Sequence, residues 1–168
     1  MIDPMGEIRI VEATERDVPV IREMIRGLAE YEHLLDMFVA TEDALRETLF
    51  GERPGAEVLL AYLDGECVGF ALFFPNYSTF LARPGLYLED LFVKPHARRQ
   101  GVGRALLRRL AGIARDRGYG RMEWSVLDWN QLAIDFYEKK LGAVMMREWR
   151  IFRLTGEGIE KLAADERG

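Results

Sequence analysis

The chain has 168 residues, of which 49% are hydrophobic and 30% charged, and its net charge is -5. The length suits one domain with a substantial core, and the composition is typical of a soluble globular protein rather than a disordered or membrane one. The negative charge argues against nucleic acid as the main partner and is compatible with a cationic ligand. No apolar run approaches the roughly 20 residues of a membrane span, and the N-terminus lacks a signal-peptide core. We therefore expect a cytoplasmic protein with no membrane partner.

The cysteine and histidine content excludes several kinds of site. Cys67 is the one cysteine, so no disulfide can form within the chain. Its apolar neighbours predict a buried strand thiol rather than a nucleophile. His33 and His96 are the two histidines, and they sit in no metal-ligand spacing, so we expect no metal.

The first half of the chain alternates between strand and helix patterns. Val18, Ile21 and Met24 recur at helical spacing, Thr41 can cap a second helix, and Asp64-Gly65 is a strong hairpin signal. The predicted elements are a strand at 7–13, helices at 14–30 and 42–50, strands at 57–64 and 66–74, and a loop at 75–85.

The second half contains the clearest helix, at 101–117, with Val102, Leu106 and Leu110 along its apolar stripe. The other predicted elements are strands at 86–93 and 121–128, a helix at 130–140, a closing strand pair at 143–146 and 148–154, and a short helix at 157–164. This order predicts one α/β domain over residues 1–168, with a mixed central sheet and helices on both faces.

The turn before the clearest helix reads RRQGVG, residues 98–103. A helix N-terminus presents unpaired N–H groups, and Gly101 and Gly103 have no side chain to keep a phosphate away from them. Arg98, Arg99 and Arg104 add positive charge. The turn therefore indicates a pyrophosphate site, although glycine spacing alone also fits an ordinary loop before a surface helix.

Two other phosphate-binding motifs match this turn less well. The chain has no GK[ST], which excludes a P-loop. A dinucleotide fingerprint needs a third glycine where Leu106 stands, and the seven residues 94–100 separate the strand from Gly101. Glu123 lies at a suitable distance along the chain for a ribose contact, which keeps that alternative open.

The strand at 86–93 contains two carboxylates, Glu89 and Asp90, among apolar residues. Neighbouring strand residues point to opposite faces unless a bulge intervenes. An ionised carboxylate buried without a partner costs several kcal/mol. We therefore expect these groups in a cleft, beside a cation, or with a raised pKa. The alternative is a pair of strand-end carboxylates bonded to backbone or arginine.

Residues 98–103 match the R/Q-x-x-G-x-G/A signature of the GNAT acetyltransferases, and the turn follows a strand and precedes a helix as in that family. The resemblance covers roughly residues 7–163 and is strongest to the diamine branch, which includes the spermidine/spermine and thialysine acetyltransferases. The matching segments are LAEYE (28–32), FGERP (50–54), YLEDLFV (87–93), VLDWNQ (126–131) and EWRIF (148–152). This resemblance implies a single GNAT domain whose mostly antiparallel sheet is splayed between two strands.

The resemblance also implies acetyl-CoA as co-substrate, no metal, and a homodimer. It places the pantetheine along Leu91, Phe92 and Val93. The remaining cofactor contacts that it implies are Arg98, Arg99, Gln100, Gly101, Val102, Gly103, Arg104, Asn130 and Tyr137. The residues that it places around the amine are Tyr31, Glu32, Glu89, Asp90 and Trp149.

The chemistry of an amine acetyltransferase suits these residue types. An alkyl ammonium of pKa ~10 must lose a proton before it attacks, and Glu89, directly or through water, is the candidate base. Tyr137 can protonate the departing thiolate, and backbone N–H groups near Val93 can polarise the acetyl carbonyl. We expect direct attack, because Cys67 lies in the wrong element for an acetyl-enzyme.

The segment after Tyr31 and Glu32 bears on the substrate. It reads His33-Leu34-Leu35-Asp36, whereas polyamine-specific relatives tend to have more acidic residues there. The sequence therefore favours thialysine, a lysine-like amine or a short diamine. A non-catalytic acyl-CoA sensor and a protein-lysine acetyltransferase remain alternatives.

Overall fold

The sheet has five strands in the spatial order β1-β2-β3-β4-β5. The structure, a computed structural model, describes residues 6–165. The first four strands are paired antiparallel and β4 pairs with β5 in parallel, which confirms the predicted mixed, mostly antiparallel sheet. The strands are β1 (Ile8–Glu12), β2 (Glu57–Leu63), β3 (Glu66–Ser78), β4 (Arg83–Val93) and β5 (Met122–Trp124).

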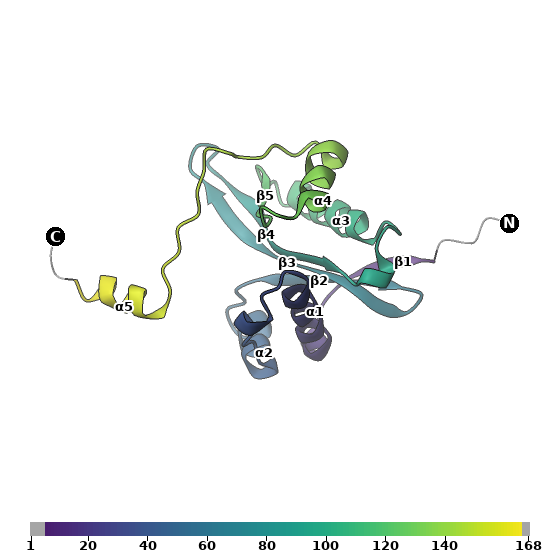
Figure 1. Cartoon of the computed structure of the whole chain (residues 1–168), viewed down its shortest axis with the longest axis horizontal. Coiled ribbons are helices and arrows are strands. Elements are labelled where there is room, and N and C mark those ends of the chain that lie inside the picture. Colours follow the sequence, from purple (N-terminus) through teal and green to yellow (C-terminus); the bar gives the residue numbers. More distant parts are fainter. Residues whose placement is uncertain (1–5, 166–168) are drawn as a thin grey trace. The chain divides into compact units, whose positions relative to one another are not determined.

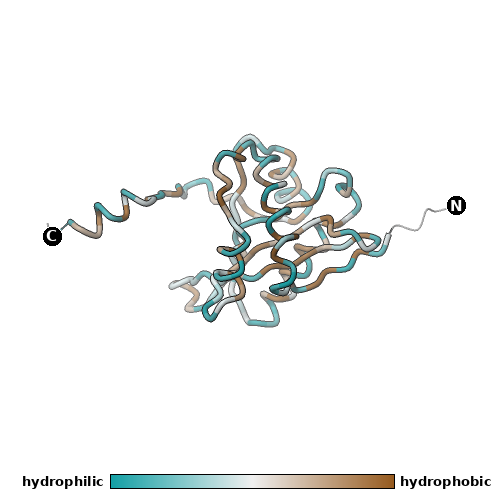
Figure 2. Tube along the Cα trace, turned by 90° about the horizontal axis from the view of Figure 1, so that it is seen from below, coloured by the Kyte–Doolittle hydropathy of each residue, from teal (hydrophilic) through white to brown (hydrophobic). Residues whose placement is uncertain are grey.

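Helices cover both faces of this sheet (Figure 1). The helices α1 (Val18–Tyr31) and α2 (Glu42–Phe50) pack on one face, and α3 (Val102–Asp116) packs on the other. Figure 2 shows the hydropathy of each residue along the chain, in which brown hydrophobic stretches alternate with teal hydrophilic ones. The core between the sheet and the first two helices includes Ile21, Met24, Leu49, Phe70 and Phe92.

Local signals in the sequence set several of these boundaries. The Thr14 N–H donates to the Asp17 carboxylate at 2.7 Å, so residues 15–17 form a 3₁₀ turn and α1 begins only at Val18. Thr41 Oγ1 accepts from the Ala44 N–H at 3.2 Å and caps α2 as predicted. Asp64 and Gly65 adopt positive φ of 51° and 84°, the geometry of a tight hairpin turn.

The loop predicted at 75–85 is mostly strand, so that prediction was wrong. β3 continues to Ser78 and β4 begins at Arg83, with Pro75 opposite Leu86. Proline is tolerated in strands where one edge has no partner. β2 reaches only as far as Phe73 along this strand, so Pro75 removes no hydrogen bond to it.

The described residues fall into two compact units divided after Leu127. The second unit contains α4 (Gln131–Asp135), the π-helical turn η4 (Phe136–Lys140) and α5 (Gly156–Ala163). The helix predicted at 130–140 is therefore present, as an α-helix up to Asp135 and a π-helical turn from Phe136.

The closing strand pair predicted at 143–154 is absent from the described residues, and β5 is shorter than the predicted strand at 121–128. A strand needs a neighbour for its N–H and C=O groups. Residues 143–154 instead form local turn bonds, in which Arg147 N donates to Met145 O at 3.1 Å and Trp149 N to Met146 O at 3.3 Å.

We predict opposite effects of adding one methyl group at two helical glycines. A Cβ at Gly27 in α1 would lie 2.8 Å from Phe92 Cε1, whereas a Cβ at Gly112 in α3 would meet nothing within 4 Å. Alanine is favoured over glycine in helices by about 1 kcal/mol, so Gly112→Ala should raise the free energy of unfolding by about that amount. Gly27→Ala should lower it by about 1–2 kcal/mol, because the buried ring must move. Urea unfolding of both variants tests this, and equal stabilisation by both would contradict it.

Candidate functional site

Strand β4 contains a bulge at Glu89. Leu72 lies opposite Asp90 while Phe73 lies opposite Leu88, so Glu89 has no partner on β3. A bulge of this kind breaks the strict alternation of side chains and re-aims them. The strand therefore does not force Glu89 and Asp90 onto opposite faces of the sheet. From the sequence, such a bulge was required if both carboxylates were to serve one site.

Three carboxylates gather where β4 meets the end of α1. Asp90 shares a strand face with Phe92, whose ring lies in the core beside Gly27 of α1. Glu32 directly follows Tyr31, the last residue of α1. The charges of Glu32 and Glu89 both act on Asp90, and the charge of Glu89 also acts on Glu32. We call Glu32, Glu89 and Asp90 the carboxylate cluster.

The electrostatics of the cluster favour a cation. Burial, and then repulsion from Glu89 and Glu32, raises the pKa of Asp90 to about 7. Burial and the charge of Glu89 likewise raise the pKa of Glu32. Within residues 6–165, no lysine or arginine forms an ion pair with any of the three. One form of the alternative required an arginine to hold these carboxylates, and among the described residues no arginine does so.

The edge of β4 beyond the bulge is open on the side of β5. The parallel pairing covers only Leu86 to Leu88 opposite Met122 to Trp124. The Tyr87 hydroxyl and Ser125 Oγ lie 3.0 Å apart just beyond the last pair. In the described chain β5 extends no further, so Leu91, Phe92 and Val93 lack a strand partner there, which is the predicted splay.

The predicted phosphate turn forms a tight loop between β4 and α3. After a 3₁₀ turn at Pro95–Ala97, Arg99 and Gly101 adopt positive φ of 64° and 87°, and α3 begins at Val102. Gln100 donates to the His96 carbonyl at 3.1 Å and stabilises the loop. A Cβ at Gly103 would meet only Val93 Cγ2, at 3.8 Å. Arg99, Gly101 and Arg104 are exposed, so an anion could reach this helix N-terminus.

The first arginine of the turn is engaged inside the fold. Arg98 Nε donates to the Val93 carbonyl at 2.9 Å. Its guanidinium carbon lies 4.4 Å from the centre of the Tyr31 ring and 5.7 Å from that of Phe92. No local pattern predicts this contact, since 66 residues separate Tyr31 from Arg98.

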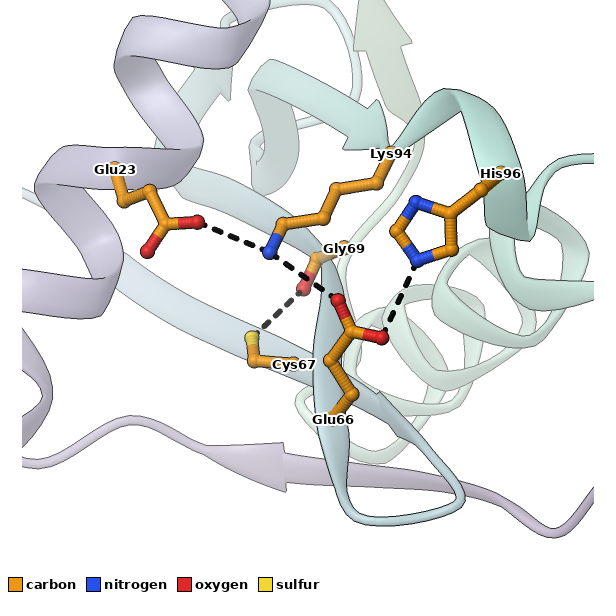
Figure 3. A network of polar contacts seen from close by, with 6 residues as sticks. All are labelled: Glu23, Glu66, Cys67, Gly69, Lys94 and His96. Carbon is orange, nitrogen blue, oxygen red and sulfur yellow. Dashed lines mark hydrogen bonds and ion pairs between the residues drawn. The ribbon is translucent and has the colours of Figure 1, made fainter.

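A polar network fixes the end of β4 to α1 and to the β2–β3 hairpin (Figure 3). Lys94 Nζ lies 3.0 Å from Glu23 and 3.6 Å from Glu66, and His96 Nε2 lies 3.3 Å from Glu66. Burial lowers the pKa of Lys94, but the hydrogen bonds and charges of the two glutamates outweigh it, so the pKa is raised overall. Lys94 is therefore a structural cation.

Cys67 belongs to the same region and is a poor nucleophile. Its Sγ lies 3.8 Å from the Gly69 carbonyl (Figure 3). Burial raises the pKa of the thiol despite that hydrogen bond, and a thiol that stays protonated does not attack. Within residues 6–165 no group of three or more histidine, cysteine or acidic side chains is placed to hold a metal ion. No helix of that range is both long and apolar enough to cross a bilayer.

The second unit contains three residues predicted for the site. Asn130 Oδ1 accepts from the Ala133 N–H at 3.3 Å and caps α4. Tyr137 lies on the π-helical turn, a feature that is frequent at functional sites. The Trp149 side chain is exposed. Their roles remain predictions, whereas Tyr31, Glu32, Glu89, Asp90 and the turn belong to the first unit.

We predict that Asp90 makes the stability of the protein depend on pH. Its pKa is about 7 in the fold against an ordinary 3.8. Its stabilising contribution is therefore complete below about pH 4 and is lost as the pH rises through about 7. Asp90→Asn should stabilise the protein by on the order of 2–4 kcal/mol more at pH 8 than at pH 4.

Urea unfolding at the two pH values measures this difference. Glu52→Gln, which removes one exposed carboxylate, controls for the change in net charge. An equal effect of Asp90→Asn at both pH values would contradict the raised pKa.

The comparisons with known proteins agree with this geometry. Residues 25–143 match the acetyltransferase (GNAT) family. The chain is 42% identical to thialysine N-epsilon-acetyltransferase of Sus scrofa, over 95% of this chain and 99% of the relative. It is 37% identical to L-ornithine N5-acetyltransferase NATA1 of Arabidopsis thaliana, over 92% and 87%. The solved structure of an integron cassette protein from V. cholerae aligns with a TM-score of 0.76 and 28% identity, over 94% and 98%. The chain thus belongs to the acetyltransferase (GNAT) family and is an N-acetyltransferase.

Proposed function

We propose that this protein transfers the acetyl group of acetyl-CoA to the terminal amine of a small aliphatic substrate. The observation that carries this proposal is the carboxylate cluster: its charges act on one another, and among residues 6–165 no lysine or arginine forms an ion pair with it, which suits an ammonium ion. The names of the relatives support thialysine, a lysine-like amine or a short diamine as the substrate.

We place acetyl-CoA along the open edge of β4. The backbone of Leu91, Phe92 and Val93 would pair with the pantetheine, since this edge lacks a strand partner in the described chain. The pyrophosphate would meet the N–H groups of residues 99–104, where Gly101 and Gly103 leave the backbone accessible. Asn130 and Tyr137 are the remaining cofactor contacts that we propose, on the family resemblance.

The cluster would bind the ammonium group and then remove its proton. An arriving cation lowers the pKa of a neighbouring carboxyl group, so Asp90 would ionise and pair with the ammonium. Glu89, which is more exposed than Asp90, would accept the proton directly or through water. Tyr31 and Trp149 would line the amine with aromatic surface, which favours alkyl ammonium ions.

Acetyl transfer would then proceed in one displacement. The amine nitrogen forms a bond to the acetyl carbon, and the bond from that carbon to sulfur breaks. Tyr137 would donate its hydroxyl proton to the departing thiolate and then take up the second proton, which the nitrogen loses as the amide forms. No acetyl-enzyme is proposed, since the Cys67 thiol has a raised pKa.

The remaining proposals concern organisation and setting. We propose that residues 1–168 act as one domain, since the family match spans both compact units. We also propose a homodimer located in the cytoplasm, acting without metal or nucleic acid. The homodimer is proposed on the family resemblance.

Release of free CoA thiol from acetyl-CoA tests the proposed function. The amine panel comprises thialysine, lysine, ornithine, short diamines, spermidine and a lysine peptide. We expect turnover with at least one small amine, and a roughly 10²–10⁴-fold lower kcat for Tyr137→Phe with its KM values largely kept. Turnover of the peptide alone would favour a protein-lysine acetyltransferase. Binding of acetyl-CoA without any turnover would favour a sensor and contradict the proposal.

A further inference from the structure

We infer that Arg98, the first arginine of the turn, is a positioning residue of the amine site. Its side chain joins the end of β4 to the end of α1. This inference rests on the proposed function, because it names a residue that shapes the site where the amine would bind.

The contacts of Arg98 account for much of its side chain. Its Nε donates to the Val93 carbonyl at 2.9 Å, and its guanidinium lies 4.4 Å from the Tyr31 ring centre and 5.7 Å from the Phe92 ring centre. A planar guanidinium can donate a hydrogen bond in its plane while its face stacks on an aromatic ring, which a lysine ammonium cannot do. These contacts explain the need for arginine better than charge alone does.

The neighbouring arginines of the turn differ from Arg98. Arg99 and Arg104 are exposed, whereas Arg98 is half-buried. The exposed pair can supply positive charge to an anion at the start of α3. Arg98 is the arginine of this turn that packs on rings of α1 and β4.

The ring that Arg98 covers leads directly to the carboxylate cluster. Tyr31 is the last residue of α1, and Glu32 follows it. One helical turn earlier, Gly27 lets the helix approach the Phe92 ring, which a Cβ would meet at 2.8 Å. The end of α1 thus lies close to β4 because Gly27 leaves room for the Phe92 ring and Arg98 contacts both Tyr31 and Val93. Loss of the Arg98 contacts would let Glu32 move away from Glu89 and Asp90.

Arg98→Lys and Arg104→Gln form a matched pair for testing this role in the full-length chain. Arg98→Lys keeps the charge and removes the planar group, and we expect it to raise KM for the amine about tenfold. We expect its dissociation constant for acetyl-CoA to stay within about twofold. Arg104→Gln removes an exposed charge. It should raise the dissociation constant for acetyl-CoA and leave KM for the amine unchanged. Thermal unfolding of both variants shows whether either is misfolded.

Tyr31→Leu provides a second route if the Arg98 variant does not fold. This change keeps Arg98 and removes the ring beneath it. It should also raise KM for the amine, and the Arg98→Lys, Tyr31→Leu double variant should be little worse than either single variant. Additive losses in the double variant would contradict a shared contact.

An NMR measurement tests the contact independently of activity. The Nε–H signal of Arg98 should exchange with solvent more slowly than that of Arg99, and it should shift in Tyr31→Leu. If Arg98→Lys weakens acetyl-CoA binding and leaves KM for the amine unchanged, Arg98 is a phosphate cation and the inference is wrong. If no amine reacts or binds, the proposed function falls as well, so the two failures can be told apart.

Discussion

The bulge at Glu89 is the constraint on which the proposed site depends. A regular strand would place Glu89 and Asp90 on opposite faces of the sheet. The bulge interrupts this alternation. The charges of Glu89 and of Glu32, which follows the end of α1, both act on Asp90. Burial of this group of like charges raises the pKa of Asp90 to about 7. The fold thus holds an acidic site that an ammonium ion would stabilise.

One strand connects the two charged features of the molecule. β4 contains two of the three cluster residues, Glu89 and Asp90, and ends at Val93, just before the arginine-rich turn. The negative site suits an amine and the positive turn suits a phosphate. The open edge between them, from Leu91 to Val93, is the length of backbone that the cofactor arm would occupy. Arg98 links the end of β4 to the end of α1, because it contacts both Val93 and Tyr31.

The sequence predicted what local patterns encode. The caps, the Asp64-Gly65 hairpin and the glycine turn before α3 are all short-range signals, and the structure contains each of them. From the sequence, a bulge at Glu89 could be named only as a requirement for bringing Glu89 and Asp90 together. Its presence depends on how β3 and β4 pair. The Arg98–Tyr31 contact joins residues far apart in the chain and left no local pattern. The strand pair predicted at 143–154 was wrong because alternation cannot supply a partner strand.

A crystal structure of the protein with coenzyme A and thialysine would test the central claim most directly. Coenzyme A carries no acetyl group, so the amine stays unreacted in such a complex. We expect the terminal nitrogen within about 3.5 Å of the carboxylate oxygens of Asp90 and of Glu89 or Glu32. A terminal nitrogen bound elsewhere, with the carboxylate cluster in contact with water alone, would contradict the account.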